Sequence, residues 1–422
     1  MYSCHATRYA EDRTPGGRPD RTVAGVPECV GGTMKIAHVQ PYDHAIPGGV
    51  REHVVNLARH QRALGHHVTV VTTASTEDGL GPGVAVVSRS VVAVPIARSI
   101  ARVSLSPLAW WRVRRLLLAG DHDVVHIHEP LAPMVALAAT CHTRTVTVGT
   151  VHGYRPEFLP YRLLRRPLDR AMRRLHARIA VSVDARRWVS QYFPADYQVI
   201  PGGVDVARFS DSALAPVARW ADGRPTVLYV GRLDQRKGFP VLLDAWPQVR
   251  RALPGARLLV TGQFDARERD RWARQVRRRG LADVELIGYV PDAELPRYYR
   301  TADVFCAPST GYEALGIVLL EAMAAGLAVV TTDIEGYRTI VRDGAEALVA
   351  PPGDVTALAD RLIAALVDTD LRARLVANGR QRVQEYDWPR LAERLLQLYA
   401  SLGAGSAEPV DHAGRPAPYG RP

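Results

Sequence analysis

The sequence predicts an α/β protein made of two Rossmann-like domains, each a doubly wound parallel sheet, that face each other across a cleft. Short apolar runs alternate with helical segments, as in D-V-V-H-I-H-E at 123–129 and V-L-Y-V at 227–230. Near-continuous apolar strands are typical of parallel sheets covered on both faces. With 422 residues and 47% apolar content, the chain exceeds one hydrophobic core and has enough apolar residues for two.

The two ends of the chain lack the pattern of a core. Residues 1–33 are rich in Gly, Pro, Arg and Thr without an apolar period, which predicts a disordered leader. Met34 then opens a first strand, M-K-I-A-H-V-Q, and we interpret it as a candidate true start. Residues 403–422 are rich in Gly, Pro and Ala and predict a disordered tail.

The first strand leads into a βαβ unit. Gly48 and Gly49 form a turn, a helix runs to Leu64 with Gly65 as its C-cap, and Val68 to Thr72 read as the next strand. The Gly-Gly turn lacks the three spaced glycines of a dinucleotide fingerprint. It therefore fits an ordinary tight turn as well as a phosphate cradle.

The remaining elements predict the domain boundaries. The first domain spans 34–205, and the second spans 206–385, with its first strand at 227–230. Residues 386–402 predict a C-terminal helix that packs back on the first domain. No solenoid period repeats along the chain.

The positive net charge of the chain restricts the classes of binding partner that we expect. The formal net charge is +11, and from Arg98 to Arg178 there are 14 Arg against 5 acidic residues. Such an excess fits nucleic acid, an anionic membrane surface or an anionic substrate. No nucleic-acid-binding motif is present, so a basic nucleic-acid-binding protein is the remote alternative.

The cysteines and histidines give no metal pattern. The four cysteines are scattered without a short pairing, which favours neither a zinc site nor a disulfide framework. His126 and His128 alternate onto one strand face beside Glu129, and a strand end that points at a ligand explains them better than a metal. His152 follows another strand, Thr145 to Val151. We therefore expect no metal or other cofactor.

The most informative stretch is Ser309 to Asp333, a polar loop, an apolar helix from Gly316 to Gly326, and a strand. Glu313 and Glu321 are eight residues apart, so we expect both carboxylates on one side of the helix. The helix N-terminus suits a phosphate, and carboxylates suit sugar hydroxyls. Arg232 and Lys237 follow another strand and supply cations for a diphosphate. The combination predicts a nucleotide sugar as ligand.

Tryptophan and arginine gather in two segments of the first domain. A helix that begins at Ser106-Pro107 reads W-W-R-V-R-R, and seven arginines lie between Tyr161 and Arg178. A solvated helix face and a membrane-surface contact both fit this composition. No run of about 18 apolar residues and no signal segment is seen, so we expect a cytoplasmic protein, peripheral on the inner face of the plasma membrane. The predicted membrane contacts are Trp110, Trp111, Arg112, Arg114 and Arg115.

Four motifs carry a family resemblance. G-R-L-D-Q-R-K-G, I-G-Y-V-P, E-A-L-G-I-V-L-L-E-A-M-A-A-G and P-G-G-V-R-E-H-V resemble the retaining GT-B glycosyltransferases of family 4 from Met34 to about Leu402. V-H-I-H-E-P-x-A-P and Y-D-W are similar to the actinobacterial phosphatidylinositol mannosyltransferases. The resemblance implies transfer of a hexose, mannose from GDP-mannose, onto an inositol lipid, with the donor diphosphate helping to deprotonate the acceptor.

The resemblance also implies roles for single residues. Arg232 and Lys237 would hold the diphosphate, Glu313 the transferred sugar and Glu321 the ribose. His152, Glu313, Arg232 and Lys237 form the catalytic set that it implies. The other donor contacts would be Gly49, Tyr289, Val290, Leu315, Gly316, Ile317 and Val318, and the acceptor contacts Tyr42 and Arg51.

The sequence departs from the family pattern at several points. Arg51 stands where an uncharged polar residue is usual, and G-Y-R-P-E-F replaces a Ser/Thr-rich loop after His152. G-Y-E-A-L-G differs from the common G-E-S-F-G, and Gly203 stands where Asn is usual. The first two changes lie on the acceptor side, so another nucleotide sugar with a soluble acceptor, such as an inositol phosphate, a sugar or a small metabolite, is the alternative. Oligomeric state is not predicted.

Overall fold

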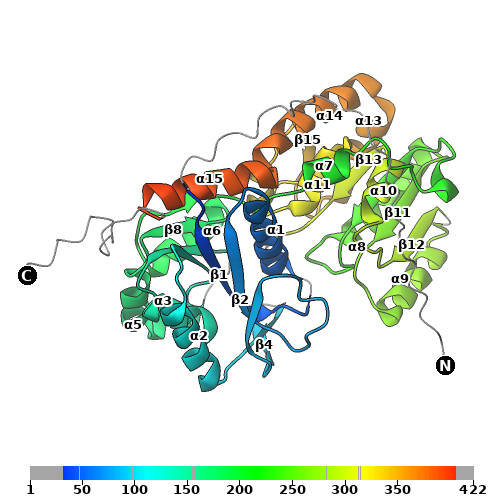
Figure 1. Ribbon diagram of the computed structural model, residues 1–422. Helices are drawn as coiled ribbons and strands as arrows, with labels where there is room; N and C mark the ends of the chain where they lie inside the picture. Colours follow the sequence, from blue (N-terminus) through cyan, green and yellow to red (C-terminus); the bar gives the residue numbers. More distant parts are fainter. Residues whose placement is uncertain are drawn as a thin grey trace, which may run out of the picture.

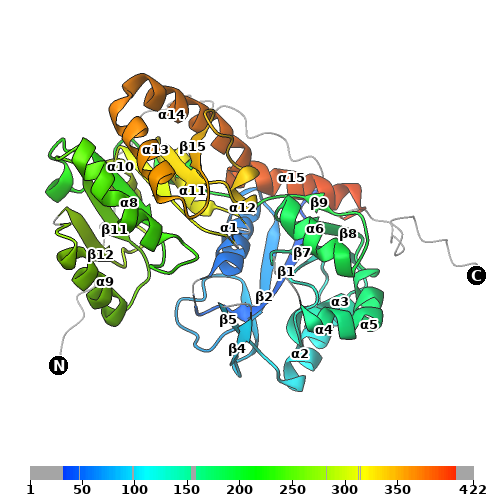
Figure 2. The same cartoon turned by 180° about the vertical axis from the view of Figure 1, so that it is seen from behind.

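The computed structural model describes residues 32–404 apart from 47, 97–98, 154–157, 282, 312 and 314. Two predicted segments lie almost entirely outside this range: the leader at 1–33, of which residues 32 and 33 are described, and the tail at 403–422, of which residues 403 and 404 are described. The described chain forms two sheets with helices on both faces (Figures 1 and 2). The predicted fold class, two Rossmann-like parallel-sheet domains, is confirmed.

The first sheet has the strand order β3-β2-β1-β6-β7-β8-β9, and each neighbouring pair on this path is parallel. The strands are β1 (Lys35–Asp43), β2 (His67–Thr73), β3 (Val84–Ser88), β6 (Val124–His128), β7 (Val146–Val151), β8 (Ala177–Ala180) and β9 (Gln198–Val199). Every residue of β6 and β7 is buried, as expected for central strands covered on both faces.

An antiparallel hairpin departs from this parallel pattern. β4 (Val92–Ile96) pairs with β5 (Ser99–Val103), and β5 joins β1 at Tyr42 and Val103. The helices of this domain are α1 (Gly49–Ala63), α2 (Pro107–Ala119), α3 (Val135–His142), α4 (Leu159–Leu163), α5 (Arg165–Met172) and α6 (Val183–Tyr192).

The second sheet is parallel, with the order β12-β11-β10-β13-β14-β15. Its strands are β10 (Thr226–Val230), β11 (Arg257–Thr261), β12 (Val284–Gly288), β13 (Val304–Ala307), β14 (Ala328–Thr332) and β15 (Ala347–Ala350). Its helices are α8 (Phe239–Ala252), α9 (Ala266–Arg278), α10 (Leu295–Thr301), α11 (Ile317–Ala325), α12 (Glu335–Arg338), α13 (Val355–Val367) and α14 (Thr369–Val383). Helix α11 ends at Gly326, whose φ of +81° is left-handed and suits a glycine C-cap.

The chain crosses between the domains twice. The outward crossing leads into α7 (Val206–Ser210) and η1 (Ala218–Trp220), and the return passes η2 (Gln384–Tyr386) into α15 (Trp388–Ser401). The two crossings are joined by a bridge between Val204 and Asp387. Helix α15, red in Figure 1, then lies along the first domain, where Leu395 and Tyr399 share a core with residues of α1 and β1.

The glycine at position 203, one of the departures from the family pattern, is explained by its contacts with the start of α15. A Cβ at Gly203 would lie 2.6 Å from a ring carbon of Trp388 and 2.9 Å from a methyl of Leu391. Carbon atoms do not approach this closely without a shift of one of them. The absence of a side chain at 203 therefore lets the start of α15 pack against the first crossing.

Candidate active site

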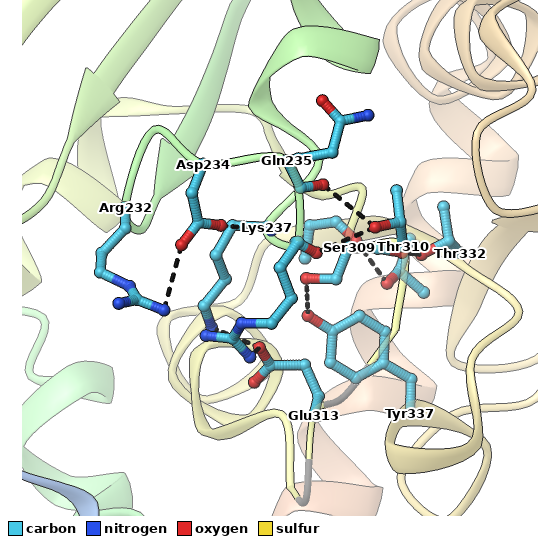
Figure 3. Close-up of polar contacts among 12 residues, drawn as sticks. Arg232, Asp234, Gln235, Lys237, Ser309, Thr310, Glu313, Thr332 and Tyr337 are labelled. Carbon is cyan, nitrogen blue, oxygen red and sulfur yellow. Dashed lines mark hydrogen bonds and ion pairs between the residues drawn. The ribbon is translucent and has the colours of Figure 1, made fainter. Parts of the chain in front are cut away.

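Two loops of the second domain bring opposite charges together. β10 and β13 are parallel neighbours, so the loops that follow them leave the same edge of the sheet. The loop after β10 carries Arg232, Arg236 and Lys237, and the loop after β13 carries Glu313. Figure 3 shows Lys237 and Glu313 pointing toward one another. Open α/β sheets bind their ligands at this edge.

Glu313 is held by two cations. Arg236 donates a hydrogen bond to Oε1 of Glu313, and Lys237 Nζ lies 2.8 Å from the same oxygen. The Glu313 side chain is only 10% exposed, so solvent screens these pairs less than it screens surface pairs. The sequence analysis assigned roles to Arg232 and Lys237 but not to Arg236, which stands directly before Lys237 in the motif G-R-L-D-Q-R-K-G.

Arg232 does not join this group. Its guanidinium lies 3.0 Å from Asp234 Oδ2, and its side chain is 47% exposed, compared with 19% for Lys237. Asp234 in turn accepts a hydrogen bond of 2.8 Å from the backbone N–H of Lys237. Asp234 thus fixes the loop through the backbone of Lys237 and pairs with the side chain of Arg232, which is more exposed than that of Lys237.

Close backbone packing joins the two loops. Gly238 has a φ of +71°, and a Cβ there would lie 1.7 Å from the carbonyl oxygen of Pro308, so only glycine fits. Thr310 donates from its backbone N–H to the Arg236 carbonyl (2.8 Å) and from its hydroxyl to the Gln235 carbonyl (3.0 Å). Figure 3 shows these bonds between the loops. The cations and Glu313 are therefore positioned by one packed unit.

The start of α11 is positioned by a buried tyrosine. A Cβ at Gly316 would lie 2.5 Å from the Tyr337 ring, and one at Gly336 would lie 1.9 Å from the carbonyl oxygen of Glu313. The Tyr337 hydroxyl lies 2.8 Å from Ser309 Oγ. Through these contacts the loop that carries Glu313 packs closely against α12. The predicted backbone donors at this helix start are Leu315, Gly316, Ile317 and Val318.

Glu321 has surroundings that differ from those of Glu313. Oε2 of Glu321 accepts a hydrogen bond of 2.7 Å from the Tyr299 hydroxyl, and burial raises the pKa of Glu321 to about 7. Helix α11 begins at Ile317, so Glu313 lies in the loop before it, as expected, and Glu321 lies within the helix.

The residues predicted to face the base lie after β12. Tyr289 is 64% exposed, whereas Val290 is 8% exposed. The aromatic ring of Tyr289 is thus available for stacking, and Val290 offers its backbone rather than its side chain.

The first domain presents its predicted contacts near α1. Gly49 is the first residue of α1, and a Cβ there would meet nothing within 4 Å. Tyr42 is half-buried at the end of β1. Arg51 donates to the carbonyl of His44 (2.7 Å) and pairs with Glu52, so its guanidinium is already engaged.

The two domains meet beside these residues. A Cβ at Gly202 would lie 3.2 Å from a methyl of Leu315 and 3.4 Å from His53 Nδ1. Leu315 belongs to the second domain and His53 to the first, so the loop that precedes α11 reaches the α1 side of the first domain. An ion pair between Arg187 and Glu335, at 3.4 Å, also links the domains.

A cluster of five histidines lies on the α1 side of the first sheet, and sequence reasoning found only part of it. His126 and His128 of β6 and His152 after β7 had been singled out; His38 of β1 and His53 of α1 had not. His38 is opposite His126 in the sheet register, which the sequence does not reveal. We call the following residues the histidine cluster: His38, His53, His126, His128 and His152.

Glu129 holds His152 in place. Oε1 of Glu129 accepts hydrogen bonds from the backbone N–H groups of His152 (2.7 Å) and Gly153 (2.6 Å). Glu129 itself has a φ of +53°, a conformation that non-glycine residues rarely adopt. Its strained backbone and two charge-assisted bonds indicate a positioning role.

Two sets within the histidine cluster have metal-ligand geometry. The ligand atoms lie within 4.8 Å of one another in His38, His126 and His128, and also in His53, His128 and His152. Both ring nitrogens of His38, His126 and His128 already take part in hydrogen bonds. The first set therefore has its polar atoms satisfied without an ion.

The residues predicted to touch a membrane lie on α2. Its inner face buries Ala109, Val113 and Leu117. Trp110 is half-buried and packs edge-on against His142, with 5.4 Å between ring centroids. The outward residues of α2 are Leu108, Trp111, Arg112, Arg114, Arg115 and Leu118.

Both domains of the chain match models of glycosyltransferase families. Residues 47–208 match the model of Glycosyltransferase Family 4, and residues 212–382 match that of Glycosyl transferases group 1. The phosphatidyl-myo-inositol mannosyltransferase of Mycobacterium tuberculosis H37Rv is 39% identical over 384 residues, which covers 89% of this chain and 99% of the relative. The chain belongs to glycosyltransferase family 4. The predicted family and the predicted enzyme class, a hexosyltransferase, are confirmed.

Further proteins are similar to this family 4 glycosyltransferase in sequence or in fold. The phosphatidyl-myo-inositol mannosyltransferase of Mycobacterium leprae is 37% identical over 377 residues, covering 89% of this chain and 99% of the relative. Sucrose-phosphate synthase from Thermosynechococcus elongatus superposes with a TM-score of 0.67 at 26% identity, covering 88% of this chain and all of the other. Anabaena HepE, solved with UDP and glucose, shares the fold with a TM-score of 0.68 at 22% identity, covering 87% of this chain and 100% of its own.

Within the described residues of this glycosyltransferase, no helix combines the length and the apolar character needed to cross a bilayer.

Proposed function

We propose that this glycosyltransferase moves mannose from GDP-mannose, with retention of configuration, onto an inositol lipid at the cytoplasmic surface of the membrane. The observation that supports it best is the joint arrangement of Lys237, Arg236 and Glu313 at the start of α11. This arrangement occurs in a chain 39% identical, over 384 residues, to a protein named phosphatidyl-myo-inositol mannosyltransferase.

Donor binding follows from the charges of the site. Glu313 pairs with both Lys237 and Arg236, and one carboxylate against two cations leaves a net positive charge. The donor diphosphate would take over these cations together with Arg232, since phosphate oxygens accept strong charge-assisted bonds. Glu313, released from its cations, would then accept hydrogen bonds from hydroxyls of the transferred sugar. Glu321 would bind the ribose, and Tyr289 would lie against the base.

The first domain would close the donor site from the opposite side. The open space at Gly49 leaves room for a phosphate at the N-terminus of α1. His152 would lie beside the sugar, and Tyr42 and Arg51 beside the acceptor.

The transfer step needs no protein base in this proposal. The acceptor hydroxyl oxygen bonds to the anomeric carbon on the face from which the diphosphate leaves, and the bond between that carbon and the diphosphate oxygen breaks. The acceptor proton passes to the leaving diphosphate, so GDP departs with it. Lys237, Arg236 and Arg232 stabilise the negative charge that develops.

These cations replace the divalent ion that many transferases use. We therefore expect turnover to persist when the enzyme is assayed in excess EDTA. Loss of activity that returns on addition of Mg²⁺ or Mn²⁺ would contradict this part of the proposal.

Acceptor access is supported by exposed apolar residues at one end of the first domain. Trp111 and Leu108 of α2 are 50% and 51% exposed, and Leu163 of α4 is 73% exposed. Helices α2 to α5 gather at this end (Figure 2). Arginines on the same helices would meet anionic headgroups while the apolar side chains enter the interface.

The decisive experiment offers the purified protein radiolabelled GDP-mannose with vesicles that contain phosphatidylinositol. We expect labelled lipid in which the new linkage has the configuration of the donor. Transfer to free inositol phosphate but not to the lipid would favour the soluble-acceptor alternative. Absence of transfer from GDP-mannose, together with transfer from another nucleotide sugar, would overturn the donor assignment.

A further inference from the structure

A line of hydrogen bonds runs from the interior of the first domain to His152. Gln61 Oε1 lies 2.7 Å from His38 Nε2, and His38 Nδ1 lies 3.1 Å from His128 Nε2. His128 Nδ1 then lies 2.9 Å from His152 Nε2. Gln61, His38 and His128 are fully buried, whereas His152 is partly exposed. We call these four residues the histidine relay.

The imidazoles of the relay are neutral. Burial lowers the pKa of His38 to about 4 and that of His152 to about 3, and it holds the pKa of His128 well below its usual value. A neutral imidazole carries one N–H donor and one acceptor nitrogen. Each histidine of the relay must therefore donate at one nitrogen and accept at the other.

The carbonyl oxygen of Gln61 fixes the direction of the relay. An amide oxygen only accepts, so His38 carries its proton on Nε2 and accepts at Nδ1. His128 must then donate from Nε2 and accept at Nδ1, and His152 must donate from Nε2. The direction of the relay thus follows from the placement of the Gln61 amide, whose Oε1 faces His38 Nε2.

We propose that Gln61, His38 and His128 are positioning residues that fix His152 in one tautomer, with an unprotonated Nδ1 offered to a hydroxyl of the donor sugar. No described residue hydrogen-bonds to His152 Nδ1, and the N–H groups held by Glu129 fix the backbone beside it. The contact with the sugar rests on the proposed function; the tautomer does not.

A fixed acceptor at His152 has a chemical consequence. A sugar hydroxyl that donates to Nδ1 is held in one orientation, and this lowers the cost of aligning the anomeric carbon. A neutral ring also adds no positive charge beside a carbon that becomes electron-poor as the diphosphate leaves. Reversal of the relay would turn Nδ1 into a donor and lose the directed contact.

The tautomer can be measured without any substrate. In protein labelled with ¹⁵N-histidine, two-bond H–N spectra distinguish protonated from unprotonated ring nitrogens, and the His152→Gln variant identifies the His152 signals by their loss. We expect Nε2 to be protonated and Nδ1 unprotonated at neutral pH. A protonated Nδ1, or averaging between the two tautomers, would overturn the proposal.

A matched pair of variants tests the effect on catalysis. In His128→Asn, the amide oxygen occupies the place of Nδ1 and still accepts from His152, whereas His128→Leu has nearly the same shape and no acceptor. Both variants remove the hydrogen-bond partner of His38 Nδ1, so this loss does not contribute to the difference in kcat between them. We expect kcat within about threefold of the wild-type enzyme for Asn and about tenfold lower for Leu, the effect of one hydrogen bond of about 1.4 kcal/mol.

His128→Leu should be the more stable of the two variants but the slower enzyme, because a buried Leu is better tolerated than a buried amide. Equal kcat values in the two folded variants would contradict the positioning role. If the enzyme transfers no mannose but His152 shows the fixed tautomer, the proposed function fails and the relay stands.

Discussion

Lys237 Nζ and Glu313 Oε1 form an ion pair of 2.8 Å in the site where the donor diphosphate is proposed to bind. The lysine is one of two in a chain that otherwise uses arginine, and the other is Lys35. Its compact charge and the planar guanidinium of Arg236 meet on the same carboxylate, so both cations would be available to a phosphate that displaced Glu313.

Substitution Lys237→Ala should lower kcat/KM by about a hundredfold, since one charge-assisted contact to a phosphate contributes about 1.5–3 kcal/mol. The fold should persist because Arg236 still neutralises Glu313. The matched control is Lys35→Ala, which removes a surface ion pair with Asp121 and should leave turnover unchanged. Wild-type kinetics in Lys237→Ala would remove the diphosphate assignment.

Substitution Glu313→Gln should mainly lower kcat. The amide keeps the size of the side chain but neither neutralises the two cations nor accepts as strongly from sugar hydroxyls. Because the freed cations attract the diphosphate more strongly, we expect the Kd of GDP to stay equal or fall. Calorimetry with GDP alongside steady-state rates separates the two effects. A large loss of GDP affinity would mean that Glu313 contacts the nucleotide.

Glu321 should make donor binding depend on pH. Burial raises its pKa to about 7, so the carboxyl is largely protonated at pH 6 and ionised at pH 8. Ribose hydroxyls bind better to the ionised form, which only accepts. We expect the affinity for GDP-mannose to rise up to about tenfold from pH 6 to pH 8.

The ligand and the variant of this experiment are chosen to isolate Glu321. GDP-mannose is preferred to GDP because a terminal phosphate itself titrates near pH 6. Glu321→Gln should bind more weakly at pH 8 and lose the pH dependence. A slope that survives in this variant would assign the titration to another group.

The fold and the placement of Arg232, Lys237 and Glu313 in loops after strands were predictable because they follow local rules. The apolar runs marked the strands, and Gly326 marked the end of α11 at the residue where the structure has it. Arg232, Lys237 and Glu313 follow predicted strands, and strand ends of parallel sheets lie at one edge. The pairing of Arg236 with Glu313 was not predictable, since it depends on how closely Gly238 lets the loops approach.

The histidine cluster shows where sequence reasoning ends. Four of its members come from β1, β6 and the end of β7, and β1 and β6 are far apart along the chain but neighbours in the sheet. The fifth, His53, comes from α1. A period-2 pattern reveals that His126 and His128 share a face, but not that His38 is their cross-strand neighbour.

The outer face of α2 should govern binding to membranes. Leu108, Trp111 and Leu118 follow one another at helical spacing and are 51%, 50% and 37% exposed. Arg115 stacks on Trp111 with 5.6 Å between its guanidinium carbon and the ring centroid. Substitution Trp111→Glu should abolish flotation with vesicles that contain phosphatidylinositol, since it replaces an interfacial aromatic ring by a charge that anionic lipid repels.

The control for Trp111→Glu is Val367→Glu, because Val367 is 58% exposed on α13 of the second domain and carries the same charge change. Val367→Glu should float like the wild-type protein. Raising the salt concentration should weaken binding of the wild-type protein without abolishing it, since salt screens the arginines but not the apolar contacts. If both variants float equally well, α2 is not the membrane face. If neither the variants nor the wild-type protein float, the result favours the soluble-acceptor alternative.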